Sequence, residues 1–126
     1  MTKQRTRTWR QLLGFHFEDE AMRFLKTKSL VLVERNYRCR LGESDLIMLD
    51  GNMLVFVEVR YRYSANHGSA IATVDLRKQA KIRLAARHFL YSHKQFQACN
   101  CRFDVLGIEA AANSGKNFCW IQSAFC

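Results

Sequence analysis

Residues 46–60, Leu-Ile-Met-Leu-Asp-Gly-Asn-Met-Leu-Val-Phe-Val-Glu-Val-Arg, decide the fold. Two apolar runs, 44–49 and 53–59, flank Asp50-Gly51-Asn52, which is a strong signal for the turn of a β-hairpin. Both runs are apolar on consecutive residues, a pattern typical of strands that are covered on both faces. The stretch therefore predicts a hairpin in the centre of a sheet, with packing layers on either side.

Outward from the hairpin, apolar periodicity and turn residues predict the remaining elements. Three- and four-residue steps between apolar side chains indicate a helix over 9–28, and Asp75 is placed to cap a second helix that runs to about residue 92. We expect further strands at 30–39, 102–109 and 118–121. Gly42 is expected to break the first strand, and 63–73 to form a mobile loop. The order is α-β-β-β-α-β-β, in which the second helix returns a strand parallel to the sheet.

The length and composition indicate a single domain. A chain of 126 residues can bury one hydrophobic core, so we expect one domain over 1–126 with a basic N-terminal arm over 1–10. No apolar stretch approaches the roughly 18 residues of a membrane span, and no apolar signal segment follows the basic start, so no membrane partner is expected. The five cysteines are an odd number without regular spacing, which suits a reducing cytoplasm. Cys99 and Cys101 are interpreted as ordinary thiols, because a C-x-C pair holds a metal only with further ligands.

The net charge of +9 favours polyanions or acidic protein surfaces as partners. Residues 1–17 and 76–103 carry Lys and Arg without a single acid, whereas most of the eleven acids lie at 18–20 and between 34 and 75. A basic surface around an acidic centre is what a nuclease needs, because phosphates must be attracted while metal ions are held. Charge alone does not distinguish this interpretation from that of a basic protein without a nucleic-acid partner.

Basic residues of the second predicted helix are candidate contacts to a phosphate backbone. Arg77, Lys81 and His88 fall along one stripe of that helix, with Lys78 beside it. No base-reading motif is present, so we expect recognition of shape or backbone. The candidate nucleic-acid-binding residues are Arg38, Arg40, Arg62, Arg77, Lys78 and Lys81.

The hairpin brings acidic side chains together. With a two-residue loop at 51–52, Asp45 faces Glu58; with the loop at 50–51, Asp45 faces Phe56. Because side chains alternate along a strand, either register leaves four charged residues on one face of the sheet. These residues are Glu43, Asp45, Glu58 and Arg60.

Two opposed carboxylates with Cβ atoms ~4.5–5.5 Å apart repel each other, and apolar surroundings increase the cost. A divalent cation is the natural compensator, and Asp45, Glu58 and the Val59 carbonyl oxygen are the hard ligands that Mg²⁺ or Mn²⁺ prefers. Such a metal polarises a phosphodiester and activates water, while Arg60 would stabilise the developing charge. From spacing alone, the alternative is a structural ladder in which Glu43 pairs with Arg60 and Asp45 forms an ion pair elsewhere.

Several motifs, in order along the chain, carry a family resemblance. They are Gly14-x-x-x-Glu18-x-x-Ala21, Arg35-Asn36-Tyr37-Arg38, Gly42-Glu43-x-Asp45-Leu46-Ile47, Phe56-Val57-Glu58-Val59-Arg60, the run 72–78, and Arg102-Phe103-Asp104-Val105. On these motifs, roughly residues 12–108 resemble the YraN-type proteins. The resemblance implies a restriction-endonuclease-like three-layer α/β fold, in which helices flank a mixed central sheet. That fold is similar to archaeal Holliday-junction resolvases and other PD-(D/E)xK nucleases.

The resemblance also implies roles for individual residues. Asp45 and Glu58 take the metal-ligand positions, Glu18 is a helix carboxylate that supports them, and Glu43 is a supporting or second-metal residue. The implied catalytic set is Asp45, Glu58, Arg60 and Glu18, and the implied metal set is Asp45, Glu58 and Glu43. Gln79 lies near the start of the second helix, where related nucleases often carry a polar active-site residue. Without the family, Glu18 is interpreted as part of a solvated helix face.

One position departs from the family pattern. The central motif usually ends in Glu-Val-Lys, whereas this chain has Arg60, which keeps the positive charge but cannot act as a general base. Three interpretations therefore stay open: a Mg²⁺-dependent endonuclease acting on branched or structured DNA, a non-catalytic nucleic-acid-binding module, and an adaptor whose basic surface meets an acidic protein. A homodimer is compatible with each of them.

Overall fold

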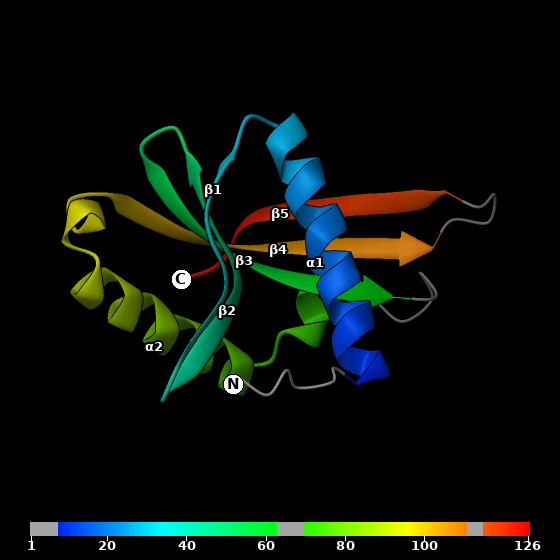
Figure 1. Cartoon of the computed structure of the whole chain (residues 1–126), viewed down its shortest axis with the longest axis horizontal. Helices are drawn as coiled ribbons and strands as arrows, with labels where there is room; N and C mark the ends of the chain where they lie inside the picture. The colour runs from blue at the N-terminus through cyan, green and yellow to red at the C-terminus, as the bar shows by residue number, and fades with distance from the viewer. Residues whose placement is uncertain (1–7, 63–69, 111–114) are drawn as a thin grey trace, which may run out of the picture.

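The structure, a computed structural model, describes residues 8–62, 70–110 and 115–126 (Figure 1). The described elements are α1 (Trp9–Thr27), β1 (Val31–Cys39), β2 (Gly42–Asp50), β3 (Met53–Arg62), η2 (Ala70–Thr73), α2 (Leu76–Ser92), η3 (Lys94–Phe96), β4 (Asn100–Ala110) and β5 (Lys116–Phe125). Most of the expected N-terminal arm and of the expected loop at 63–73 lies outside the described residues. Within the described part of the chain, no helix is long and apolar enough to cross a membrane.

The five strands form one mixed sheet in the order β1-β2-β3-β4-β5. Neighbouring strands run antiparallel except β3 and β4, which are parallel and are connected through α2. A parallel pair needs such a crossover, because the chain must return to the same end of the sheet. The predicted order α-β-β-β-α-β-β is confirmed, with two short 3-10 helices added.

The sheet is covered on both faces, which confirms the three-layer α/β expectation. Apolar side chains of α2, including Phe89, pack with Ile47 and Phe56 on one face. Those of α1, including Leu25, pack with Leu46 on the other face. Figure 1 shows α1 lying across the sheet and α2 lying apart from α1. Consecutive apolar residues in the central hairpin are buried because their side chains alternate between two covered faces.

The hairpin adopts the first of the two predicted registers. Asp50 pairs with Met53 and Leu46 with Val57, so the loop consists of two residues, 51 and 52. Gly51 has a φ of 59°, a left-handed conformation that glycine adopts at little steric cost. The register places Asp45 and Glu58 directly after the last pair of the ladder.

Gly42 has a different role from the predicted strand break. It is the first residue of β2 and pairs with Cys39, while the turn falls at residues 40 and 41. A Cβ atom on Gly42 would lie 1.9 Å from the carbonyl oxygen of Lys81. Glycine is therefore required here for space, because the backbones of β2 and α2 are in close contact.

The start of α2 follows the predicted cap. The Asp75 carboxylate Oδ1 accepts the backbone N–H of Lys78 at 2.8 Å, which satisfies one of the free amides of the first helical turn. The predicted Asp75 cap is thus confirmed. It fixes the first turn of the helix, and Lys78 is part of that turn.

The Arg-Phe-Asp-Val motif of β4 forms a structural network away from Asp45 and Glu58. Asp104 is fully buried and accepts hydrogen bonds from Arg102 Nε, Trp120 Nε1 and the Ser123 backbone N–H. Arg102 Nη2 also reaches Asp50 at 2.9 Å. A buried carboxylate needs such partners, and here they tie β4 to β5 and to the hairpin turn.

Candidate active site

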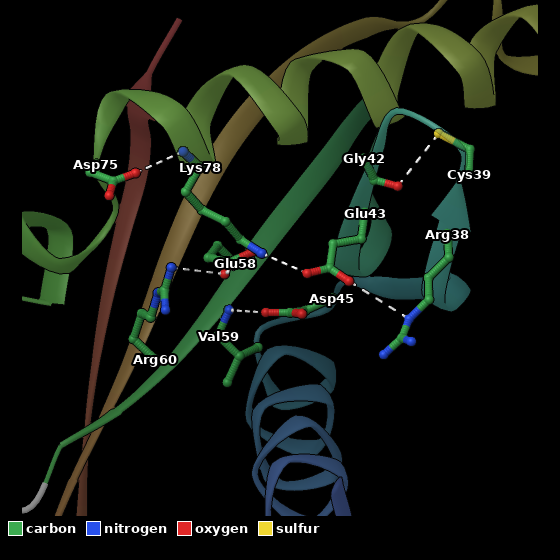
Figure 2. A network of polar contacts seen from close by, with 10 residues as sticks. All are labelled: Arg38, Cys39, Gly42, Glu43, Asp45, Glu58, Val59, Arg60, Asp75 and Lys78. Atoms are coloured by element: carbon green, nitrogen blue, oxygen red, sulfur yellow. Dashed lines mark hydrogen bonds and ion pairs between the residues drawn. The ribbon is translucent and has the colours of Figure 1, made fainter. Parts of the chain in front are cut away.

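Two carboxylates meet where β2 and β3 part. The ladder ends at the pair Leu46 and Val57, and the next residues along the strands are Asp45 and Glu58. Asp45 Oδ2 accepts the backbone N–H of Val59 at 2.9 Å (Figure 2). The side chain of Asp45 thus replaces the backbone acceptor that β2 no longer provides, and this bond holds its carboxylate beside β3.

Burial makes this pair of carboxyl groups hard to ionise together. The Glu58 side chain is only 4% exposed, and its Oε2 is buried without a hydrogen-bond partner among the described residues. Burial, reinforced by the charge of Asp45, raises the pKa of Glu58 from 4.5 to about 8. Burial also raises the pKa of Asp45, although the Val59 N–H opposes the shift. Without a bound cation the pair therefore retains a proton near neutral pH.

Two basic side chains contact Glu58 from different elements. Lys78 Nζ lies 2.9 Å from Glu43 Oε1 and 3.7 Å from Glu58 Oε1. Arg60 Nη2 lies 3.3 Å from the same Glu58 oxygen. Figure 2 shows Lys78 reaching from α2 to the carboxylates of β2 and β3. Burial lowers the pKa of Lys78, but the hydrogen bond to Glu43 and the nearby carboxylates raise it more, so Lys78 keeps its charge at neutral pH.

Glu43 does not pair with Arg60, its partner in the predicted ladder. It accepts Lys78 Nζ, and its Oε2 lies 3.7 Å from Arg38 Nε. The hydrogen bond from Lys78 lowers the pKa of Glu43 against the opposing effect of burial. The alternative in which Glu43 pairs with Arg60 is therefore wrong, because Glu43 forms an ion pair with Lys78 and Arg60 forms one with Glu58.

A three-carboxylate metal site is absent from the described part of the chain, where no three His, Cys, Asp or Glu side chains are grouped to hold an ion. Glu43 is thus not placed as a third ligand with Asp45 and Glu58. The pair itself fits a hard divalent cation, because it offers a buried carboxylate oxygen without a partner beside a second carboxylate. The backbone carbonyl of Val59, water and phosphate oxygens would complete the coordination.

Glu18 of α1 belongs electrostatically to the same site. Burial, and then the charge of Asp45, raise the pKa of Glu18 to about 7, while a hydrogen bond with Asn36 opposes the shift. Its neighbours Asp19 and Glu20 form the ion pairs of the helix instead. Glu18 is therefore not part of a solvated face.

Three other predicted residues lie differently from expectation. Lys78 was expected to face a phosphate backbone, but it points into the carboxylates and is only 21% exposed. Arg62 is buried, so its guanidinium is not part of an exposed basic surface. Gln79 donates to the Val74 carbonyl at 3.0 Å and not to the carboxylates. No sequence signal distinguished Lys78 from its basic neighbours, because its direction depends on how α2 docks on β2.

The remaining predicted contacts are exposed at the surface. They are Arg38 and Arg40 near the β1–β2 turn and Arg77 and Lys81 on α2. The close approach of Gly42 to Lys81 brings that turn beside the helix. The structure thus brings Arg38 of one segment and Lys81 of the other near Glu43.

The raised pKa of Glu58 predicts how stability depends on pH. A carboxyl group whose pKa is higher in the folded state stabilises the fold below its unfolded value of 4.5 and loses that contribution as pH rises to about 8. In EDTA, the free energy of unfolding should fall between pH 5 and pH 8 more steeply for the wild type than for Glu58→Gln. Urea denaturation across this range measures the difference, with Glu34→Gln as the control that should follow the wild type. Parallel curves for all three proteins would contradict the assignment.

The fold and the site define a mixed α/β protein, with helices on both faces of a five-stranded sheet and paired carboxylates where two central strands separate. The chain belongs to the uncharacterised protein family UPF0102, whose family model matches residues 17–108. This confirms the YraN-type resemblance. The chain is 52% identical over 113 residues to a UPF0102 protein of Aeromonas hydrophila, covering 89% of this chain and 83% of the relative. It is 47% identical over 121 residues to one of Herminiimonas arsenicoxydans, covering 96% and 92%.

Proposed function

We propose that this protein binds nucleic acid and hydrolyses phosphodiester bonds at the Asp45–Glu58 pair with bound Mg²⁺ or Mn²⁺. The observation that carries the proposal is the pair itself. Two carboxyl groups from adjacent strands are buried side by side, and apart from the hydrogen bond that Asp45 and Glu58 share, Glu58 Oε2 has no partner within the described residues. A purely structural role would not favour two acidic side chains here, because burial raises the pKa of both carboxyl groups and makes their ionisation costly.

Asp45, Glu58 and the Val59 carbonyl would hold the metal. When bound, the metal would polarise the phosphodiester and lower the pKa of a water ligand. In the hydrolysis, the water oxygen bonds to phosphorus, one backbone phosphorus–oxygen bond breaks, and the departing oxygen takes up a proton. The Val59 N–H keeps Asp45 oriented throughout, and the nearby Glu18 carboxyl group, whose pKa burial and the charge of Asp45 raise to about 7 in the metal-free site, would respond to the charge of the metal.

We propose DNA of branched or otherwise structured form as the substrate. The net charge of +9 and the exposed basic residues near Glu43 favour a phosphate backbone over a neutral ligand. The basic surface combines residues of the β1–β2 turn with residues of α2. We expect a surface made of two such segments to recognise the shape of a phosphate backbone. The proposed contacts are Arg38, Arg40, Arg77 and Lys81.

Changing Arg77 and Lys81 together to Ala should weaken binding to all DNA sequences alike. Binding releases fewer counter-ions for each phosphate contact that is lost. With two contacts removed, the slope of log affinity against log salt should flatten by roughly two units. Fluorescence anisotropy at several salt concentrations measures this slope. Lys26→Ala with Lys28→Ala removes the same charge at the end of α1 and should change the slope much less. Equal slopes for the two double variants would place the DNA elsewhere.

A cleavage panel tests the proposed function. Duplex, single-stranded, flap and four-way-junction DNA would be incubated with the protein in Mg²⁺, in Mn²⁺ and in EDTA. We expect metal-dependent cleavage that is strongest on a branched substrate. Absence of cleavage on every substrate with either metal would remove the enzymatic part of the proposal.

The second candidate is a non-catalytic nucleic-acid-binding module. It is favoured by Arg60, which stands where the family usually has a lysine, because arginine cannot exchange a proton with water at neutral pH. This module would still bind DNA in a salt-dependent manner. It is distinguished from the nuclease by calorimetry, since it has no need of a divalent ion.

A further inference from the structure

Lys78 is placed at the acidic pair by two features of the fold. Asp75 caps α2 and bonds to the Lys78 backbone N–H, which fixes the first turn of the helix. Gly42 lets that helix approach β2 to within backbone contact. The ammonium group then reaches Glu43 at 2.9 Å and Glu58 at 3.7 Å, one carboxylate on each strand.

Arg60 and Lys78 share an oxygen but differ in what they can offer a substrate. Arg60 contacts Glu58 from two residues further along the same strand, and its Nε is buried without a hydrogen-bond partner among the described residues. Lys78 has three N–H donors, of which Glu43 takes one at hydrogen-bond distance while Glu58 is farther away. Its side chain is 21% exposed and that of Arg60 is 29% exposed, so both lie at the edge of the site, and Lys78 differs from Arg60 in reaching carboxylates of both strands.

We infer that Lys78 is a catalytic residue of this site, which binds a non-bridging oxygen of the scissile phosphate and stabilises the charge that develops on it. The inference rests on the proposed function and names Lys78 as the basic side chain that acts in the hydrolysis. Lys78 keeps its proton throughout, so its role is electrostatic. A fixed donor aimed at developing charge lowers the barrier because it needs no reorganisation during the reaction.

The same position gives Lys78 a second, measurable effect on metal binding. Its ammonium group lies 3.7 Å from Glu58 Oε1, an oxygen that the metal would also approach. Two cations near one carboxylate repel each other, so Lys78 weakens metal binding while it assists the chemistry. A residue with only a structural role would not have these two opposite effects.

The test is Lys78→Met, which keeps the length of the side chain and removes its charge. In the full chain, Mn²⁺ affinity measured by calorimetry over a pH series and extrapolated to the ionised carboxyl pair should rise about tenfold, because the competing cation is gone. At neutral pH the gain is smaller, because loss of Lys78 also raises the pKa of Glu58. The kcat for the best DNA substrate in Mg²⁺ should fall about 100-fold, with a smaller change in KM. Lys26→Met, an exposed lysine on α1, is the matched control and should leave both quantities at the wild-type value.

A second variant tests whether a lysine at another position of the site can replace Lys78. Arg60→Lys in the Lys78→Met background places a lysine where the guanidinium lay 3.3 Å from Glu58, and it should restore part of the lost kcat. Unchanged or weaker Mn²⁺ binding by Lys78→Met after that extrapolation, or unchanged kcat, would overturn the inference while wild-type cleavage keeps the proposed function. If the wild type neither binds Mn²⁺ nor cleaves DNA, the proposed function fails and the inference fails with it.

Discussion

Asp45→Asn combined with Glu58→Gln is expected to abolish Mn²⁺ binding and to reduce metal-dependent cleavage at least about 1,000-fold. Both substitutions keep the size of the side chain but remove the charge that a hard cation requires. At pH 8 in EDTA, the same variant should be more stable than the wild type by about 1 kcal/mol, because two opposed carboxylates no longer repel each other. Calorimetry with Mn²⁺ and thermal denaturation in EDTA measure the two effects.

Glu34→Gln on β1 is the control for this double variant. Glu34 lies on another strand and no contact with the carboxylate pair involves it, so Mn²⁺ affinity should not change. Gain of stability together with loss of metal binding is the pattern of a functional site, whose residues are not optimised for the fold. Equal Mn²⁺ affinity in the double variant and the wild type would exclude the Asp45–Glu58 metal site.

Gly42→Ala should destabilise the protein by about 3 kcal/mol, the upper part of the range for overpacking. The new Cβ would lie 1.9 Å from the Lys81 carbonyl oxygen, and this atom belongs to a helix backbone that cannot rotate away. Relief requires α2 to move from β2, which also draws Lys78 away from Glu43 and Glu58. The free energy of unfolding in urea measures the first effect, and Mn²⁺ calorimetry detects the second.

Gly14→Ala on α1 provides the opposite result for the same chemical change. Apart from its own helix backbone and chain neighbours, no atom of the described part of the chain lies within 4 Å of a Cβ at Gly14, and alanine is favoured over glycine inside a helix by about 0.5–1 kcal/mol. This variant should therefore be slightly more stable than the wild type. If Gly42→Ala were equally well tolerated, the close contact between β2 and α2 would be disproved.

Local sequence patterns predicted most of the fold. Consecutive apolar residues on both sides of the Gly51-Asn52 loop predicted central strands, and this depended only on side-chain alternation and turn chemistry. Asp75 predicted the start of α2 because an N-cap bonds to an amide only three residues away. The hairpin also predicted Asp45 and Glu58 on one face of the sheet, whereas the choice between the two possible registers came from the structure. All of these features involve residues close in sequence or joined by one tight turn.

The roles of Lys78, Arg62 and Gly42 could not be predicted in this way. All three depend on where an element of the sheet meets a distant part of the chain. One side of a helix looks the same in the sequence whether it faces solvent or carboxylates, so Lys78 was grouped with the exposed cations. Arg62 lies at the end of a strand whose covering layer was not predictable from its neighbours.

The sequence by itself determined the order of the elements, the central hairpin and the acidic pair, because these follow from periodicity and from contacts across one turn. Only the tertiary structure decided which basic side chain of α2 contacts the acidic residues of the hairpin. Docking of α2 against β2, permitted by the absence of a side chain at Gly42, brings Lys78 to Glu43 across 35 residues of chain. Such a contact depends on the summed packing of two layers against the sheet, and no local pattern encodes that sum.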